Sequence, residues 1–140
     1  MIRTKSYTID LPPLSWKRCE LSGRQFFDGQ KKEKVIFGLS MRRSHGNDPI
    51  FAKPVMFHNA TFFFPFPKSR HKCEEDDFYV GRCDIDNLVK FIFDAAVDAE
   101  ILIDDNIICA MGRIKKVYSH HPRTDFSFTE LPKSSIGFNF

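Results

Sequence analysis

Residues 85–97 repeat their apolar side chains at spacings of three and four, which places them along one face of an α-helix. The members of this stripe are Ile85, Leu88, Val89, Ile92, Phe93, Ala96 and Val97. Asp84 precedes the stripe, and an aspartate there is suited to capping the free backbone N–H groups of a helix. The segment therefore predicts an amphipathic helix whose apolar face is buried within a globular domain.

Four other segments have the composition of β-strands. Residues 6–11 alternate between apolar and polar and end at a proline pair, which cannot donate to a β-ladder. Residues 54–67 are bounded by prolines and rich in phenylalanine, so they predict a central strand and much of the core. Residues 106–118 are rich in Ile and Val and predict a further strand. The tail from Thr124 predicts one more strand, at an edge of the sheet.

A second helix is predicted over residues 29–41. Val35 and Leu39 lie four residues apart and are expected to face the core, with Phe27 and Ile36 beside them. Gly38 weakens the last turn of this prediction. The outer side of the helix would carry Lys31, Lys32 and Lys34.

Composition limits the class of protein. A chain of 140 residues corresponds to a single domain, here residues 1–140. No apolar run approaches the ~18 to 20 residues that span a bilayer, and the first residues lack the apolar segment of a secretory signal, so we expect a cytoplasmic protein without membrane contact. The net charge of +3 and pI near 8.7 permit nucleic-acid binding without requiring it. The four cysteines form no CxxC pair, which argues against a zinc site or a disulfide framework.

Residues 68–81 predict an exposed, mobile loop. The segment is polar, and its acidic run at residues 74–77 follows the basic residues Lys68, Arg70 and Lys72. These basic side chains are candidates for phosphate contacts. The acidic run is interpreted as solvated surface, with metal binding or folding away as the alternatives.

Carboxylates gather at the start of the strong helix. Asp84 and Asp86 flank Ile85, Asn87 follows, and Lys90 lies four residues after Asp86 on the same helical face. A second acidic pair, Asp104-Asp105, precedes the strand predicted over residues 106–118. Two or three carboxylates can hold a hydrated Mg²⁺, which activates water and offsets phosphate charge, while a lysine adds a point positive charge. This residue set predicts metal-assisted phosphodiester cleavage.

The position of the second acidic pair stays open. A helix from Asp86 to about Asp98 is roughly 20 Å long, which would place Asp104-Asp105 at its far end. Residues 100–104 can run back beside the helix, since each extended residue covers ~3.3 Å. Otherwise the pair belongs to the site of a partner subunit.

Together these motifs resemble the RusA family of Holliday-junction resolvases. The resemblance is carried by Asp84-Ile85-Asp86-Asn87-Leu88-Val89-Lys90, then Phe93-Asp94-Ala95, then Ile103-Asp104-Asp105 before a hydrophobic strand. The opening strand with its proline turn, Asp28-Gly29-Gln30, and the strand over residues 54–67 are similar as well.

The resemblance implies a small α/β (α+β) fold, with a mixed β-sheet packed by two main helices, and a homodimer. It also implies Mg²⁺ or Mn²⁺ as cofactor and branched DNA, the four-way junction, as substrate. By position, Asp84, Asp86 and Asp105 would be the essential, metal-binding carboxylates and Lys90 the essential lysine. Asn87 and Asp104 would support them.

The sequence departs from the family pattern in two places. The connection before the motif is longer and carries the acidic run, and Ser15-Trp16-Lys17-Arg18 replaces the Asn and Arg that usually follow the proline turn. Trp16 is predicted to pack in the core or an interface rather than on a base. Candidate DNA contacts are Lys17, Arg18, Lys31, Lys32, Lys68, Arg70 and Lys72. The alternatives are a non-cleaving module that binds branched DNA, and an unrelated domain whose acidic groups are caps and surface.

Overall fold

The computed structural model describes residues 2–17, 20–22, 25–68 and 73–133, which fold into a four-stranded sheet with two helices and a separate small hairpin. The elements in chain order are β1 (Thr4–Ile9), β2 (Glu20–Ser22), β3 (Gln25–Phe27), α1 (Lys31–His45), β4 (Val55–Phe64), α2 (Ile85–Asp98), the 3-10 turn η1 (Asp105–Ile107), β5 (Ile108–Tyr118) and β6 (Arg123–Glu130). Within these residues, no helix has both the length and the apolar character needed to span a bilayer.

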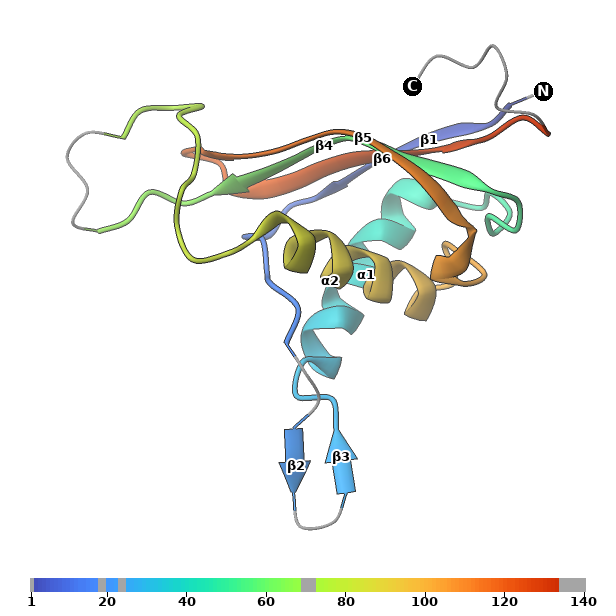
Figure 1. The fold of residues 1–140 in the computed structure, drawn as a ribbon, viewed down its shortest axis with the longest axis horizontal. Coiled ribbons are helices and arrows are strands. Elements are labelled where there is room, and N and C mark those ends of the chain that lie inside the picture. The colour runs from blue at the N-terminus through green and yellow to red at the C-terminus, as the bar shows by residue number, and fades with distance from the viewer. Residues whose placement is uncertain (1, 18–19, 23–24, 69–72, 134–140) are drawn as a thin grey trace.

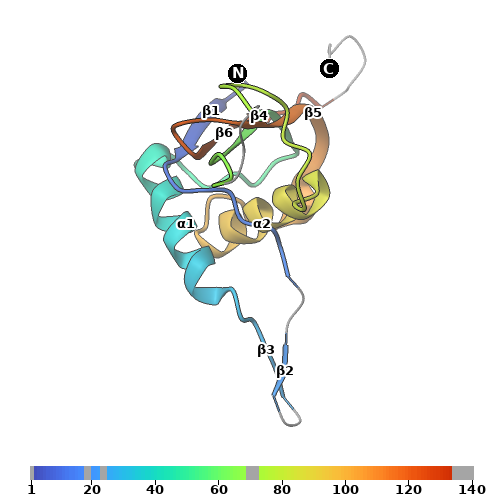
Figure 2. The same ribbon diagram turned by 90° about the vertical axis from the view of Figure 1, so that its left-hand side faces the viewer.

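The sheet is mixed and has the order β1-β6-β4-β5. β4 and β5 are parallel and are joined through α2, whereas β6 is antiparallel to both β1 and β4. Both helices lie on the same face of the sheet (Figures 1 and 2). This arrangement confirms the α+β fold with a mixed sheet and two main helices.

Most predicted elements are present, with shifted ends. The first strand covers Thr4–Ile9 rather than 6–11, and α1 extends one turn beyond residue 41. The central position predicted for the phenylalanine-rich strand is confirmed, because β4 has a neighbour on each side. The edge position predicted for the last strand is wrong: β6 lies inside the sheet, where both of its backbone edges are hydrogen-bonded.

The buried face of α1 also differs from the prediction. Val35 and Leu39 are 52% and 60% exposed, and the helix instead buries Lys34, Phe37, Gly38, Met41 and His45. Lys34 can be buried because its ammonium lies 2.8 Å from Asp28 and 3.4 Å from Asp94 of α2.

Gly38 allows the two helices to approach closely. A Cβ at this position would lie 2.9 Å from the Cβ of Ala99, closer than side chains normally come. Aromatic side chains fill the rest of the layer between the helices and the sheet. Phe91 of α2 packs edge-on against Phe37 of α1 at 5.0 Å, and Phe93 packs in the same way on Phe57 of β4.

Two residues with left-handed backbone angles interrupt β4 and β5 at the same level. Asn59 has φ 51° and Arg113 has φ 55°, and the strands pair on both sides of them, His58 with Gly112 and Ala60 with Ile114. The register of β4 against β6 shifts by one residue there, which marks a β-bulge. The bulge reverses which residues of each strand face the helices.

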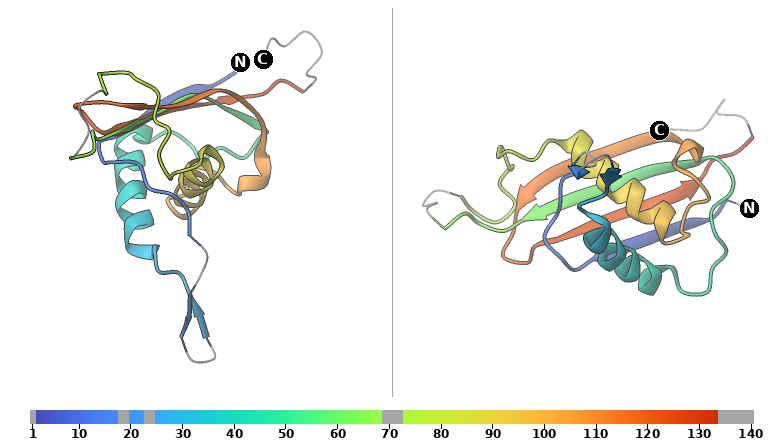
Figure 3. Two further views of the ribbon diagram at one scale, coloured as in Figure 1. Left: turned by 60° about the vertical axis from the view of Figure 1, so that its left-hand side comes forward. Right: turned by 90° about the horizontal axis from the view of Figure 1, so that it is seen from below.

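Two segments lie outside the helix-on-sheet layers. The β2–β3 hairpin forms an arm that projects beyond the helices, away from the sheet (Figures 1 and 3). Residues 73–81, the described part of the predicted loop, run beside the end of β5, where Tyr118 exchanges backbone hydrogen bonds with Asp76 and Asp77. These residues are largely exposed, as predicted, and the predicted mobility of the loop stays a prediction.

Candidate active site

Asp84 begins α2 without capping it through its side chain. Its backbone is extended (φ −82°, ψ 146°), and its carbonyl accepts the N–H of Leu88 at 3.1 Å. The carboxylate makes no capping hydrogen bond, so the predicted side-chain cap is wrong. The negative charge of Asp84 therefore stays exposed to solvent at the helix N-terminus, next to the free N–H groups of the first turn.

Asp86, Lys90 and Asp105 line one cavity of about 430 Å³. After the end of α2 the chain turns back along the helix. The turn is held because the backbone N–H of Ile101 donates to the carbonyl of Ala96 and the Ile101 side chain is fully buried. Asp105 then follows at the start of η1 and faces the same cavity as the first turns of α2. Of the two routes left open by the sequence, the structure brings Asp105 to Asp86 within one chain.

The remaining wall of this cavity is apolar. It consists of Ile85, Val89, Phe93, Met111 and Ile114. Met111 and Ile114 are three residues apart on β5 and would point to opposite faces of a regular strand. The left-handed Arg113 between them puts both on the side of α2.

The acidic side chains divide into free and occupied groups. Asp84, Asp86 and Asp105 are exposed, and within the described residues none of their carboxylates forms an ion pair. Asp104 is occupied, because its carboxylate accepts the N–H of Asp105 at 2.8 Å and so fixes the start of η1. Asp94 of the Phe93-Asp94-Ala95 motif is also occupied, by Lys34.

These donors fit a hydrated divalent cation rather than an enclosed one. Over the described ranges, no three His, Cys, Asp or Glu side chains lie close enough together to surround an ion. Asp86 and Asp105 share a cavity, whereas Asp84 is not part of its lining. Mg²⁺ ordinarily keeps several waters and takes one or two carboxylates from a protein, so this pair of oxygen donors suits it.

Lys90 does not pair with Asp86, although the two are one helical turn apart. Its ammonium nitrogen lies 3.5 Å from the centre of the Trp16 ring. The backbone N–H of Trp16 in turn donates a hydrogen bond to the backbone carbonyl of Asn87 at 2.9 Å. Trp16 is half-buried and packs against the core, as predicted, but its contact with Lys90 was not predicted.

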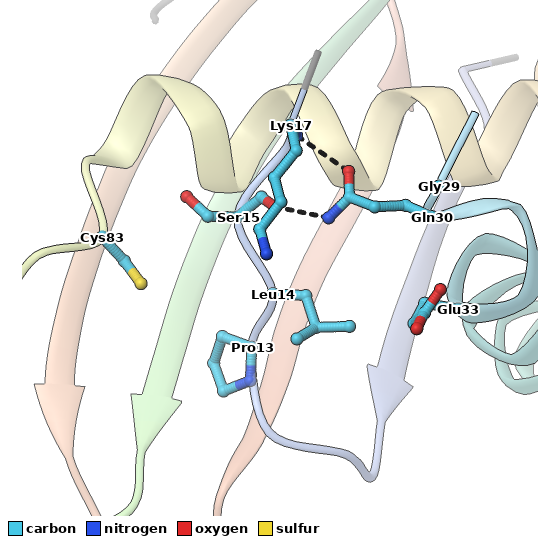
Figure 4. Close-up of a pocket in the computed structure, with 8 residues that line it drawn as sticks. All are labelled: Pro13, Leu14, Ser15, Lys17, Gly29, Gln30, Glu33 and Cys83. Carbon is cyan, nitrogen blue, oxygen red and sulfur yellow. Dashed lines mark hydrogen bonds between the residues drawn. The ribbon is translucent and has the colours of Figure 1, made fainter. Parts of the chain in front are cut away.

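Gln30 holds the segment that carries Trp16. Its side-chain nitrogen donates to the carbonyl of Ser15, and its side-chain oxygen accepts the N–H of Lys17, both at 2.8 Å (Figure 4). Gln30 and Lys17 line a second cavity of about 320 Å³ with Glu33 and Cys83. The base of the β2–β3 arm is thereby attached to the starts of both helices.

The predicted DNA contacts are only partly described. Lys17, Lys31, Lys32 and Lys68 are exposed, and Lys31 and Lys32 form the first turn of α1. Arg18, Arg70 and Lys72 lie outside the described residues.

The acidic run folds against the turn between β5 and β6. Glu75 accepts hydrogen bonds from the hydroxyl of Ser119 and the N–H of His120, each at 2.7 Å, and these bonds hold the pKa of Glu75 below its usual value. Asp77 accepts the N–H of Glu74. The run is therefore structural as well as exposed, and it does not line the cavity of Asp86.

A family model described as "Endodeoxyribonuclease RusA" matches residues 30–127, which is more than half of the chain. The interval contains both helices and every residue that lines the cavity of Asp86, whereas Trp16 and the β2–β3 arm precede it. No curated protein matches the chain significantly.

Proposed function

Because the chain belongs to the RusA family of endodeoxyribonucleases, we propose that it is a metal-dependent nuclease that resolves four-way DNA junctions by paired symmetric nicks. The observation that carries the proposal is the meeting of Asp86, Lys90 and Asp105 at one cavity within the matched interval. These side chains come from two parts of the chain, and among the described residues none of them forms an ion pair.

Each residue has a distinct part in the proposed reaction. Asp86 and Asp105 would hold the cation, and Asp84 would add negative charge at the start of α2. A bound Mg²⁺ or Mn²⁺ supplies an activated water and offsets charge on the scissile phosphate. Lys90 places a positive charge beside a phosphate oxygen or the leaving group. Asp104 fixes η1 and so the direction of Asp105.

The proposed assembly follows from the symmetry of the proposed substrate. A four-way junction is resolved by two cuts related by a two-fold axis, so we propose a homodimer with two identical sites. Backbone and shape contacts would come from Lys17, Lys31, Lys32 and Lys68, together with Arg18, Arg70 and Lys72. Such binding should weaken steeply with salt, because lysine and arginine displace condensed counterions. The proposed role is DNA recombination and repair inside a cell, nucleoid-associated or encoded by a virus.

Two aspartates on α2 make a matched test. Asp86 lines the cavity and has no ion-pair partner among the residues that the structure describes, whereas Asp94 lies two turns further on and is paired with Lys34. With labelled junction DNA and Mg²⁺, we expect Asp86→Asn to lower the cleavage rate about 100-fold or more, as losing a charge-stabilising group does in other enzymes. Asp84→Asn and Asp105→Asn should act similarly, while Asp94→Asn should cleave at nearly the wild-type rate.

Several outcomes would contradict the proposal. Cleavage that persists in EDTA would exclude the metal mechanism. Equal cutting of linear duplex would exclude junction selectivity. If Asp94→Asn lost as much activity as Asp86→Asn while both variants remained folded, the assignment of the site would be wrong.

One observation favours a second candidate, a module that binds branched DNA without cutting it. In the described part of a single chain, no three acidic side chains converge on one point. If the wild-type protein binds the junction in Mg²⁺ and in Mn²⁺ but releases no nicked product, this second function is supported instead.

A further inference from the structure

Trp16 lies outside the matched interval but contacts a residue of the proposed site inside it. Its ring is 3.5 Å from the Lys90 nitrogen, which is well within the range of a cation–π contact. Tryptophan has the strongest ring quadrupole of the aromatic side chains, so it is the best suited to hold an ammonium group. Trp16 and Lys90 are 74 positions apart in the chain, so their contact exists only because of the fold.

Hydrogen bonds at three consecutive residues hold the backbone that carries the ring of Trp16. The carbonyl of Ser15 and the N–H of Lys17 both bond the buried side chain of Gln30, and the N–H of Trp16 bonds the carbonyl of Asn87. The backbone on both sides of the ring is thus held by Gln30, directly before α1, and by Asn87 in the first turn of α2. A long lysine side chain on a helix surface samples many rotamers, and a fixed ring face restricts its charged end to one place.

The contact with Trp16 also leaves the Asp86 carboxylate without the lysine partner expected one helical turn away. An aspartate and a lysine four residues apart on a helix normally attract each other. Here Lys90 forms no ion pair within the described residues, and its ammonium is on the ring instead of on Asp86. The Asp86 carboxylate consequently remains available to a cation, while the positive charge of Lys90 stays at the rim of the same cavity.

We propose that Trp16 is a positioning residue of the site: it holds the Lys90 ammonium beside the cavity and away from Asp86. The inference rests on the proposed nuclease function, in which Lys90 and Asp86 act on the phosphate and the cation separately. Trp16 itself does not touch the reacting atoms, and it acts only through Lys90.

The first test compares two replacements of Trp16. Trp16→Phe keeps a ring face under Lys90, whereas Trp16→Leu keeps apolar bulk without a ring. We expect Trp16→Leu to lower the single-turnover cleavage rate of a labelled junction about two- to tenfold, the rate equivalent of a partly exposed cation–π contact. Trp16→Phe should recover most of that loss. The dissociation constant for the junction, measured in EDTA by fluorescence anisotropy, should stay within about twofold of wild type for both variants, because no phosphate contact is removed.

The cleavage results can overturn the inference in two ways. A wild-type rate in Trp16→Leu would show that the ring does not position Lys90. A loss of junction affinity that accounts for the whole loss of rate would make Trp16 a DNA contact instead. Thermal unfolding of Trp16→Leu and Trp16→Phe, compared with the wild type, separates either result from a simple loss of folded protein.

A second test does not depend on cleavage. Trp16 is the only tryptophan, so the tryptophan emission of the protein reports on its ring alone. We expect Lys90→Met to change the emission intensity by removing the charge from the ring face. Lys53→Met, at an exposed lysine between α1 and β4, is the control and should leave it unchanged. Identical emission in Lys90→Met and wild type would overturn the contact itself. A protein that shows the emission change but never cleaves DNA would refute the proposed function and leave the contact established.

Discussion

Replacing Lys34 with methionine removes the positive charge that ties α1 to α2. The ammonium of Lys34 lies 2.8 Å from Asp28 and 3.4 Å from Asp94, and its side chain is only 8% exposed. Methionine preserves most of the buried stem but leaves two carboxylates facing a position that no longer carries a charge. We therefore expect Lys34→Met to lower the free energy of unfolding.

The size of the loss follows from how exposed the two carboxylates are. Breaking a fully buried ion pair costs about 3–5 kcal/mol, and a hydrogen bond to a charged group contributes about 1.5–3 kcal/mol. The side chains of Asp28 and Asp94 are 28% and 29% exposed, so water can hydrate them once Lys34 is gone. The cost should therefore be near the lower end, about 2 kcal/mol. Lys31→Met, one turn earlier and exposed, is the matched control and should stay within about 0.5 kcal/mol of wild type.

The difference between Lys34→Met and wild type should depend on pH. The hydrogen bond from Lys34, with a smaller one from the N–H of Gln30, lowers the pKa of Asp28 below its ordinary 3.8. Stability from a lowered carboxyl pKa is complete above the unfolded value and is lost as the pH falls through the folded one. Burial alone would lower the pKa of Lys34, but the bond to Asp28 and the charge of Asp94 raise it above 10.5. The difference should thus be constant near neutral pH and shrink below pH 3.8 and above pH 10.5.

Urea unfolding, followed by far-UV circular dichroism and by the emission of Trp16, measures these quantities. The double variant Lys34→Met with Asp94→Asn should recover part of the loss, because it removes one of the two uncompensated charges. The reasoning would be refuted if Lys34→Met and Lys31→Met unfolded at the same urea concentration. It would also be refuted if the difference at pH 7 persisted in full at pH 3.

Three further predictions concern packing and the loop. Gly38→Ala should lower the melting temperature, because overpacking against Ala99 costs about 1–3 kcal/mol and the gain in helix propensity is only about 1; a higher melting temperature in calorimetry would contradict this. Tyr7→Phe removes the 2.7 Å hydrogen bond to the buried ring of His45, and urea unfolding should show a loss of about 1–2 kcal/mol; a loss near zero would mean that the bond contributes nothing net. Glu75→Ala removes the acceptor that joins the loop to the β5–β6 turn, so amide exchange in the residues after it should accelerate while global unfolding is unchanged; wild-type protection of those amides would contradict the assignment.

The parts of the fold that the sequence predicted are those that depend on local periodicity. The stripe along α2 needs only the helical repeat, and four of its members, Leu88, Val89, Ile92 and Ala96, are buried. Phe91 is buried although it is outside the stripe, because α1 packs on that side of the helix at Phe37. The buried face of α1 was not predictable in this way, since it depends on a lysine whose partners lie outside the helix.

The sequence named the candidate site residues one by one, but it did not predict how they are arranged in space. The residue types at 84, 86, 90 and 105 pointed to phosphate chemistry, and the resemblance assigned their roles. The sequence left open whether Asp105 returns to α2, because that depends on the burial of Ile101 and its bond to Ala96. The contact between Trp16 and Lys90 has no local signal at all, since the two residues come from separate segments.

The paired left-handed residues Asn59 and Arg113 limit how the lengths of β4 and β5 can evolve. Each strand reverses its inward-facing residues at the same level, so the two remain in step only while both carry the extra residue. Deleting Arg113 from β5 alone would shift the rest of that strand by one residue against β4, so that Lys115 instead of Ile114 would lie opposite Ala60. We therefore expect the lengths of these two strands to be inherited as a unit, with any insertion or deletion in one matched by a compensating change in the other.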